Sequence, residues 1–306
     1  MHSRSSLKDC VQSAGKKIVP VLLALCLLMP QGALASPASG NTARAASQAA
    51  PATPQAASAQ NTPQRIQPAA AFALLSAEAE KGNAGAMLDL GRFYEQGVGT
   101  ARNYTKALEW YEKAAKAGQA AGFYNVGVCY EIGMGATADT AKAVQNIYKA
   151  AEMGMALAMH KLASMCILGR GVTKDIATGI LWLEKAANTG MPAAANDLGG
   201  IYLSGLLGQK KDETKALSFF MKAADLGSLD AIRNIADMHK AGIGTKADPV
   251  AAYSWYTILR RGGYTGEDAV RMLGLLEGSL STAQVQQAQK TAETWLENYA
   301  RQQAGK

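Results

Sequence analysis

Residues that carry common catalytic and metal-binding chemistry are scarce in this sequence. Its 306 residues include only three histidines and four cysteines. His160 has no cysteine or carboxylate at the spacing of a metal-binding motif. The glycine-rich turns lack the preceding strand that a phosphate-binding loop requires. We therefore expect neither a metal nor a nucleotide cofactor.

Charged residues are also few, at 18% of the chain, and the formal net charge is +7. No run of lysines and arginines is interleaved with aromatic residues, as it would be on a nucleic-acid-binding surface. We therefore expect no nucleic-acid partner. Hydrophobic residues make up 48% of the chain, which is ample for the core of a folded domain.

The longest apolar run lies near the N-terminus, at residues 18–29. It is too short to cross a bilayer, which takes about 20 residues. Lys16 and Lys17 precede it and a small-residue motif ending at Ala35 follows it, which is the organisation of an export signal. We expect residues 1–35 to be a signal peptide cleaved after Ala35, and the mature protein to be periplasmic or secreted without a membrane span. An uncleaved membrane anchor is the alternative.

The next segment, residues 36–68, has almost no large apolar side chains. It consists mainly of Ala, Ser, Pro, Gln, Asn and Thr, a composition that cannot bury enough surface to offset the entropy cost of ordering. We expect this segment to be a flexible tether.

Beyond the tether the chain repeats itself. Nearly the same nine residues occur four times, as WYEKAAKAG, NIYKAAEMG, WLEKAANTG and FFMKAADLG (110–118, 146–154, 182–190 and 219–227). The period is 36 residues, with one step of 37 that is caused by an extra residue between Gly205 and Gly208. Such a period is typical of a solenoid, in which units that could not fold alone stack to share a core.

Each unit is predicted to be a helix, a loop and a second helix. In the first helix, helix A, apolar residues recur at every fourth position, as at Ala86, Leu90 and Tyr94, which puts them on one face. A G-x-G pair ends helix A because glycine adopts positive φ cheaply there. The second helix, helix B, carries a pair of alanines that lets it pack tightly against its partner. It is preceded by a turn-forming or capping residue: Asn103, Asp139, Asp175, Asp212 or Asp248.

The two ends of the repeat array differ from its middle. Residues 71–82 match helix B alone and form an N-terminal half-repeat, so that the solenoid covers residues 69–265. After it, Glu267–Glu277 can form a helix with inward-facing apolar residues (Val270, Leu273 and Leu276). Ser281 and Gln284 form a capping box for a last helix with one apolar face (Val285, Ala288, Ala292, Trp295 and Tyr299). We expect residues 266–306 to be a C-terminal cap of two helices.

The cysteines predict little redox chemistry. Cys10 and Cys26 would leave with the signal peptide, and Leu25 before Cys26 excludes a lipoprotein, because lipid attachment requires a small residue there. Cys129 and Cys166 fall on equivalent helices of neighbouring repeats. Such helices lie roughly 8–10 Å apart, whereas a disulfide needs Cα atoms within about 7 Å. We expect two buried thiols, with a disulfide as the alternative.

The repeated pattern resembles the Sel-one-like repeat, a relative of the tetratricopeptide repeat. The first full unit carries the pattern almost letter for letter, at Ala86, Leu90, Gly91, Tyr94, Gly97, Gly99, Ala107, Trp110, Ala114, Ala115 and Gly118. Other units depart from it: Cys166 and His239 replace the tyrosine, Ala163 and Ala236 replace the helix-A glycine, and Asn146 replaces the tryptophan. The resemblance implies an all-α fold, a right-handed α/α superhelical solenoid of five repeats, with helix A lining its concave face.

The same resemblance implies an adaptor that binds an envelope or host protein or peptide through the helix-A groove. Alignment places fourteen residues in that groove: Leu88, Arg92, Glu95, Tyr124, Val128, Glu131, His160, Ser164, Ile167, Asn196, Leu203, Arg233, Asp237 and Lys240. The alternative is that these side chains are ordinary solvated surface. We expect a monomer, with a tethered homo-oligomer as the structural alternative.

One enzymatic alternative also comes from the resemblance. Cysteine-rich bacterial members of the family have been labelled β-lactamases, which would make this chain an envelope hydrolase or a β-lactam-binding protein. The motif S-x-x-K occurs at Ser5–Lys8 and Ser13–Lys16, both within the predicted signal, and the rest of the chain has neither S-D-N nor K-T-G. We therefore expect no enzymatic activity and assign no catalytic residue. His239 replaces a core tyrosine, so we expect a core histidine.

Overall fold

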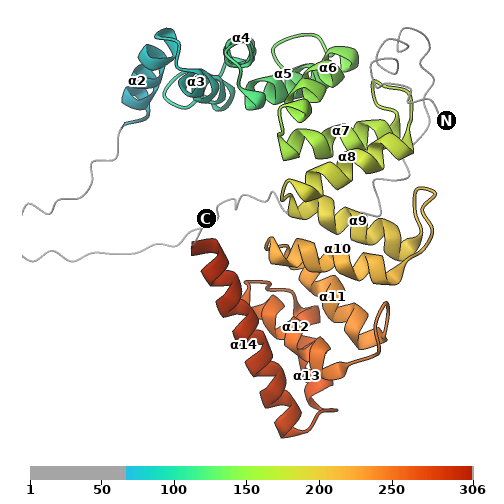
Figure 1. The fold of residues 1–306 in the computed structure, drawn as a ribbon. Helices are drawn as coiled ribbons and strands as arrows, with labels where there is room; N and C mark the ends of the chain where they lie inside the picture. The colour runs from blue at the N-terminus through green and yellow to red at the C-terminus, as the bar shows by residue number, and fades with distance from the viewer. Residues whose placement is uncertain (1–66, 305–306) are drawn as a thin grey trace, which may run out of the picture. The chain divides into compact units, whose positions relative to one another are not determined.

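The computed structural model describes residues 67–304, so the predicted signal peptide and all but the end of the tether lie outside it. Within these residues every regular element is an α-helix (Figure 1). The helices are α2 (Pro68–Glu80), α3 (Ala84–Gln96), α4 (Tyr104–Lys116), α5 (Ala120–Ile132), α6 (Thr140–Glu152), α7 (Ala156–Leu168), α8 (Ile176–Asn188), α9 (Pro192–Ser204), α10 (Glu213–Asp225), α11 (Leu229–Ala241), α12 (Pro249–Arg261), α13 (Glu267–Glu277) and α14 (Thr282–Ala304).

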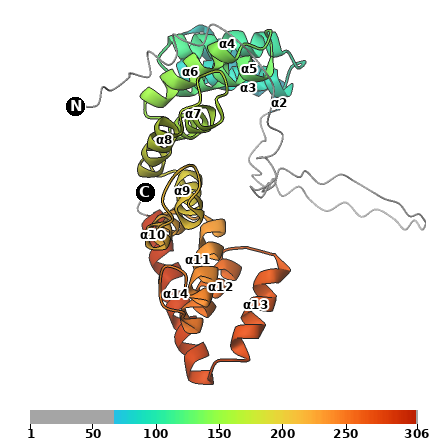
Figure 2. The same ribbon diagram turned by 90° about the vertical axis from the view of Figure 1, so that its right-hand side faces the viewer.

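Ten of these helices form five A–B pairs, which we call repeats 1 to 5. Helices α3, α5, α7, α9 and α11 are the A helices, and α4, α6, α8, α10 and α12 are the B helices. Each helix packs against the next one along the chain, within a repeat and between repeats (Figures 1 and 2). The expected all-α solenoid is confirmed. None of the helices from α2 to α14 is both long and apolar enough to cross a membrane.

The residues predicted to bound the helices do so. Asn103 and Asp139 are N-caps of helix B, and their side-chain oxygens each accept a hydrogen bond of 3.0 Å from the backbone N–H three residues later. The equivalent aspartates of repeats 3, 4 and 5 do the same. The first glycine of each G-x-G, such as Gly97, is the left-handed C-cap of helix A. Satisfied helix ends fix the length of each unit.

The second glycine of the G-x-G has a role that the sequence did not indicate. Gly135 has a φ of +78°. A Cβ atom added to it would lie 2.3 Å from the backbone oxygen of Tyr104, which is the first residue of the preceding helix B. The same closeness recurs at Gly99, Gly171 and Gly244. These glycines let each A–B loop touch the start of the preceding B helix. Gly208 of repeat 4 is the exception, because nothing lies within 4 Å of its Cβ position.

The core combines large apolar side chains, such as Tyr111 and Phe220, with small residues of helix B and the glycine or alanine of helix A that faces it. The alanine pairs of repeats 1 to 4, such as Ala114 and Ala115, are buried. In repeats 1, 2 and 4 a large B-helix side chain fits over the A-helix glycine: in repeat 4, Phe220 lies so close to Gly199 that a Cβ there would be 2.5 Å from its ring. Small residues therefore let the paired helices approach closely.

The last two helices form where the sequence places them. The capping box of α14 is present, with Gln284 Oε1 accepting from the Ser281 N–H at 2.9 Å and Ser281 Oγ accepting from the Gln284 N–H at 3.3 Å. The apolar face of α14 packs on α12. The expectation that Val270 faces inward is wrong: it is 51% exposed, while Leu276 is buried. Besides Leu276, Ala269 of α13 is buried in the core, and Leu273 packs against it partly buried.

Both remaining cysteines are buried, as expected. Cys129 is a free thiol, so the alternative of a disulfide with Cys166 is not realised. Burial raises the pKa of the Cys129 thiol to about 12, which keeps it protonated. This side chain packs as a small apolar residue.

Candidate functional site

The fourteen predicted groove residues lie on successive turns of the five A helices, and we call them the helix-A row. Within one helix they are spaced by three or four residues, as at Leu88, Arg92 and Glu95, so they share a stripe. Arg92, Arg233 and Lys240 are exposed, and the other members are half-buried. The row is therefore neither core nor freely solvated surface.

Neighbouring repeats are joined along this row by polar contacts. His160 Nε2 on α7 lies 2.8 Å from Asp197 Oδ2 on α9. Asn196 Oδ1 on α9 accepts a hydrogen bond of 3.2 Å from Asn234 Nδ2 on α11. Each contact runs from a row residue of one repeat to the residue that follows the equivalent row position in the next. From repeat 3 to repeat 5 the helix-A row is thus a ladder in which one repeat touches the next.

The ladder continues into the C-terminal helices. Arg233 on α11 forms an ion pair of 2.9 Å with Asp268 on α13. Partial burial alone would raise the pKa of the Asp268 carboxyl, but the hydrogen bond from the Tyr264 hydroxyl and the Arg233 guanidinium help to hold it below its usual value. The first residues of α13 therefore extend the polar row beyond repeat 5.

Repeats 2 and 3 are joined by an ion pair instead. Lys161 Nζ on α7 lies 2.6 Å from Glu131 Oε2 on α5, and both side chains are largely buried. Burial, with the Glu131 carboxylate nearby, raises the pKa of the Tyr124 hydroxyl. Tyr124, Glu131 and Lys161 thus form one compact cluster at the second junction.

The row also contacts helix B within a repeat. The Tyr111 hydroxyl of α4 donates to Glu95, and the Tyr256 hydroxyl of α12 donates to Asp237 at 2.6 Å. Burial is the main cause that raises the pKa of both tyrosines, and the carboxylates add to it. Two carboxylates of the row are therefore used to satisfy buried hydroxyl groups.

Replacement of Tyr111 by phenylalanine is expected to make the free energy of unfolding fall less steeply as the pH rises into the alkaline range. The pKa of Tyr111 is raised in the folded state. The stabilisation that its hydroxyl contributes to the free energy of unfolding is therefore complete below about pH 10, the pKa of an unfolded-chain tyrosine. It is lost as the pH rises further, since the unfolded chain then releases a proton that the folded chain keeps. The free energy of unfolding, measured by urea titration from pH 8 to 11, should fall less steeply in Tyr111→Phe. At pH 8 the variant should be less stable by about 1 kcal/mol.

Sequence reasoning missed the partners of the row. Lys161, Asp197 and Asn234 each directly follow a predicted groove position, and Asp268 lies outside the repeats. The signal that could have found them is the polar character of this position, which is Asp89, Asn125, Lys161, Asp197 and Asn234 in repeats 1 to 5. When the repeats are aligned position by position, a contact between a row position in one repeat and the following position in the next repeat is not apparent.

The row offers recognition groups and no assembled catalytic or metal chemistry. Within residues 67–304, no group of three or more His, Cys, Asp and Glu side chains could hold a metal ion. His239 is half-buried and burial lowers its pKa, which keeps it neutral as a core histidine would be. The arrangement can hydrogen-bond a peptide backbone and pair with side chains of either charge.

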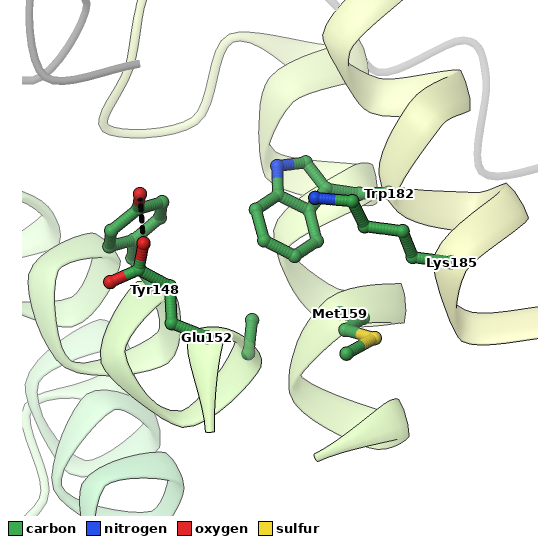
Figure 3. Close-up of a pocket in the computed structure, with 6 residues that line it drawn as sticks. Tyr148, Glu152, Met159, Trp182 and Lys185 are labelled. Atoms are coloured by element: carbon green, nitrogen blue, oxygen red, sulfur yellow. Dashed lines mark hydrogen bonds between the residues drawn. The ribbon is translucent and has the colours of Figure 1, made fainter. Parts of the chain in front are cut away.

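A hollow of about 300 Å³ lies away from the row, where α6 and α8 meet α7 (Figure 3). Ala151, Met159 and Trp182 are its apolar lining residues. Glu152 on one wall accepts a hydrogen bond of 2.5 Å from the Tyr148 hydroxyl. That bond is the main cause that raises the pKa of Tyr148 to about 12. None of these residues was predicted as a site.

The comparisons with known proteins agree on the repeat. The Sel1 repeat model matches residues 84–119, 124–155, 156–191, 192–228 and 229–264. A Sel1 repeat protein from Oxalobacter formigenes is similar in structure, with 31% sequence identity and a TM-score of 0.57, over 63% of this chain and 79% of that chain.

Two more distantly related solved structures are also similar. One is a protective antigen of uropathogenic Escherichia coli strains displaying an SLR fold (24% identity, TM-score 0.43, 77% of this chain and 58% of that chain). Another is an immunity protein from Pseudomonas aeruginosa (21% identity, TM-score 0.42, 74% and 77%). No curated protein matches. With five matched repeats over more than half of its length, the chain belongs to the Sel1 repeat family, whose members are commonly scaffolds for protein–protein interaction.

Proposed function

We propose that this protein is an exported interaction scaffold that binds a protein or peptide through the helix-A row. The observation that carries the proposal is the helix-A row itself: five successive A helices present polar groups, with charges of both signs, beside half-buried apolar side chains such as Val128 and Ile167. Such a mixed surface suits a partner that is read along its length.

Export is the second part of the proposal. The motif of residues 1–35, with its lysines, its short apolar run and its small residues, supports a cleaved signal. The partner would then be an envelope or host protein. No catalytic step is proposed, because the row contains recognition groups without a paired nucleophile and base.

Site-specific photocrosslinking tests this function. A photoreactive residue placed at Arg92 or Lys240, both exposed members of the row, should give discrete protein adducts in the native host cell. The matched controls are Glu109 and Lys116, exposed positions on helix B of repeat 1, which should give none. Adducts of equal yield from both sets, or none from the row, would count against the proposal. The intact mass of the same chain reports whether cleavage follows Ala35.

A further inference from the structure

Helix α14 covers the outward surface of the last B helix. Trp295 of α14 packs edge-on against Trp255 of α12, with ring centroids 5.6 Å apart, and Glu293 pairs with Arg261 at 3.1 Å. In the two ribbon views α14 runs alongside α12 (Figures 1 and 2). Ser254 and Ile258 of α12 are accordingly only 3% and 2% exposed.

The corresponding surface is uncovered two repeats earlier. By the repeat register, Leu181 and Lys185 of α8 stand where Ser254 and Ile258 stand in α12. Leu181 is 58% exposed. The same outward position is polar in the other repeats (Glu109, Gln145 and Ser218), so repeat 3 alone among repeats 1 to 4 presents a large apolar side chain there. A single exposed leucine is common on protein surfaces, so Leu181 gains significance only from its position beside the hollow and from the cover that α14 gives the equivalent surface of repeat 5.

The hollow described above lies beside Leu181 in the chain, since the next residue, Trp182, lines it (Figure 3). Tyr148 meets Trp182 edge to face at a centroid distance of 6.1 Å, and the Lys185 ammonium lies 4.1 Å from the centroid of the indole ring. Glu152 is occupied by the Tyr148 hydroxyl. The hollow is therefore lined by two aromatic rings, with the Lys185 cation and the Glu152 anion on opposite sides of it.

The next junction shows how the same place can be closed. There Lys222 and Asn188, the equivalents of Lys185 and Glu152, are joined by a hydrogen bond of 2.6 Å. At the hollow, each of the two charged side chains instead contacts an aromatic residue of its own helix. The junction between repeats 2 and 3 is thereby left open for a side chain from outside.

We propose that the surface formed by Leu181 and the hollow, which we call the helix-B site, binds an amphipathic helix of a protein partner. The molecule's own α14 sets the precedent for this occupant, because α14 lies on the equivalent surface of repeat 5 through a tryptophan. The partner helix places a tryptophan or tyrosine in the hollow against Trp182 and Tyr148, and packs apolar side chains on Leu181. An acidic residue near that aromatic side chain pairs with Lys185.

A synthetic peptide with the sequence of α14 is a direct probe. A fluorescently labelled peptide of residues 282–304 should bind the full chain saturably, as measured by fluorescence anisotropy. Replacement of Leu181 by glutamate should weaken binding by tenfold or more, since it puts a charge in the apolar contact. The matched control is Ser218→Glu, at the same outward position of repeat 4, which should leave binding unchanged.

Three results would overturn the proposal. The first is no binding of the peptide to the native chain. The second is binding that is insensitive to Leu181→Glu, which would show that the peptide only displaces the chain's own α14 from α12. The third is equal binding of a peptide carrying Trp295→Ser. Because Leu181 is exposed, Leu181→Glu is expected to melt as the native chain does, which circular dichroism checks. The helix-A row is untouched by these variants, so either proposal can fail alone.

Discussion

Replacement of Gly135 by alanine is expected to destabilise the protein by about 2–5 kcal/mol, whereas Gly208→Ala should cost only about 1–2 kcal/mol. Both glycines have φ in the left-handed region, +78° and +73°. An alanine there costs about 1–2 kcal/mol, and the gain from a stiffer unfolded chain is the same for both. They differ in surroundings: the new methyl group at residue 135 meets the Tyr104 carbonyl oxygen, and the one at residue 208 meets nothing.

The difference between the two variants isolates the contact between repeats. Backbone atoms of Tyr104 belong to a packed helix and cannot swing aside as a side chain could, so overpacking adds about 1–3 kcal/mol. Urea unfolding of both variants, followed by circular dichroism, measures the difference. Equal losses of stability would show that the second glycine of the G-x-G serves only its own turn.

The two glycines also show which features of the fold can be predicted from the sequence alone. The periodic apolar residues, the glycine C-caps and the Asp or Asn N-caps predict where each helix begins and ends, because these effects act within a few residues. The contact of Gly135 with Tyr104 joins two repeats, and no local pattern reveals it. The loop that ends at Gly208 has one more residue between its two glycines, and there nothing lies within 4 Å of the Cβ position.

The helix-A row shows the same limit at the level of the site. Helical spacing predicts that Leu88, Arg92 and Glu95 share a stripe, and the structure has them so. It does not predict that His160 meets Asp197, because that contact depends on the offset between two stacked helices. The hollow is even harder to predict from the sequence. Its lining comes from three helices and depends on which charged groups face each other across it.

Helix α14 covers the outer surface of helix B in repeat 5, whereas the middle repeats leave the equivalent surface exposed. In repeat 5 the lysine of helix B is replaced by Ile258 and the alanine pair by Leu259 and Arg260. Ile258 and Leu259 are buried. A B helix with this apolar outer surface needs a covering element to stay soluble, as terminal repeats of a solenoid generally do. The cap and the last repeat are therefore one energetic unit.

Replacement of Trp295 by alanine should weaken the packing of α14 on repeat 5 and lower the free energy of unfolding by about 2–4 kcal/mol. Removal of a fully buried tryptophan costs about 3–5 kcal/mol, and Trp295 is only half-buried, so we expect a loss smaller by about 1 kcal/mol. Trp295 stacks on Tyr299, and the Tyr299 hydroxyl lies where a Cβ of Gly227 would be, so α14 would also lose its hold on the turn after α10. The matched control is Glu297→Ala on the same helix, where the side chain is 68% exposed and the change should stay within about 0.5 kcal/mol.

The effect should be local, because each repeat of a solenoid is stabilised mainly by its neighbours. Native-state hydrogen exchange of Trp295→Ala should show faster exchange in α12 and α13, with the amides of α3 to α6 unchanged. Loss of protection throughout residues 67–304 would instead mean that the solenoid unfolds as one cooperative unit. Unchanged protection in α12 would mean that α14 contributes nothing to the last repeat, and would remove the precedent that α14 sets for a helix bound at Leu181.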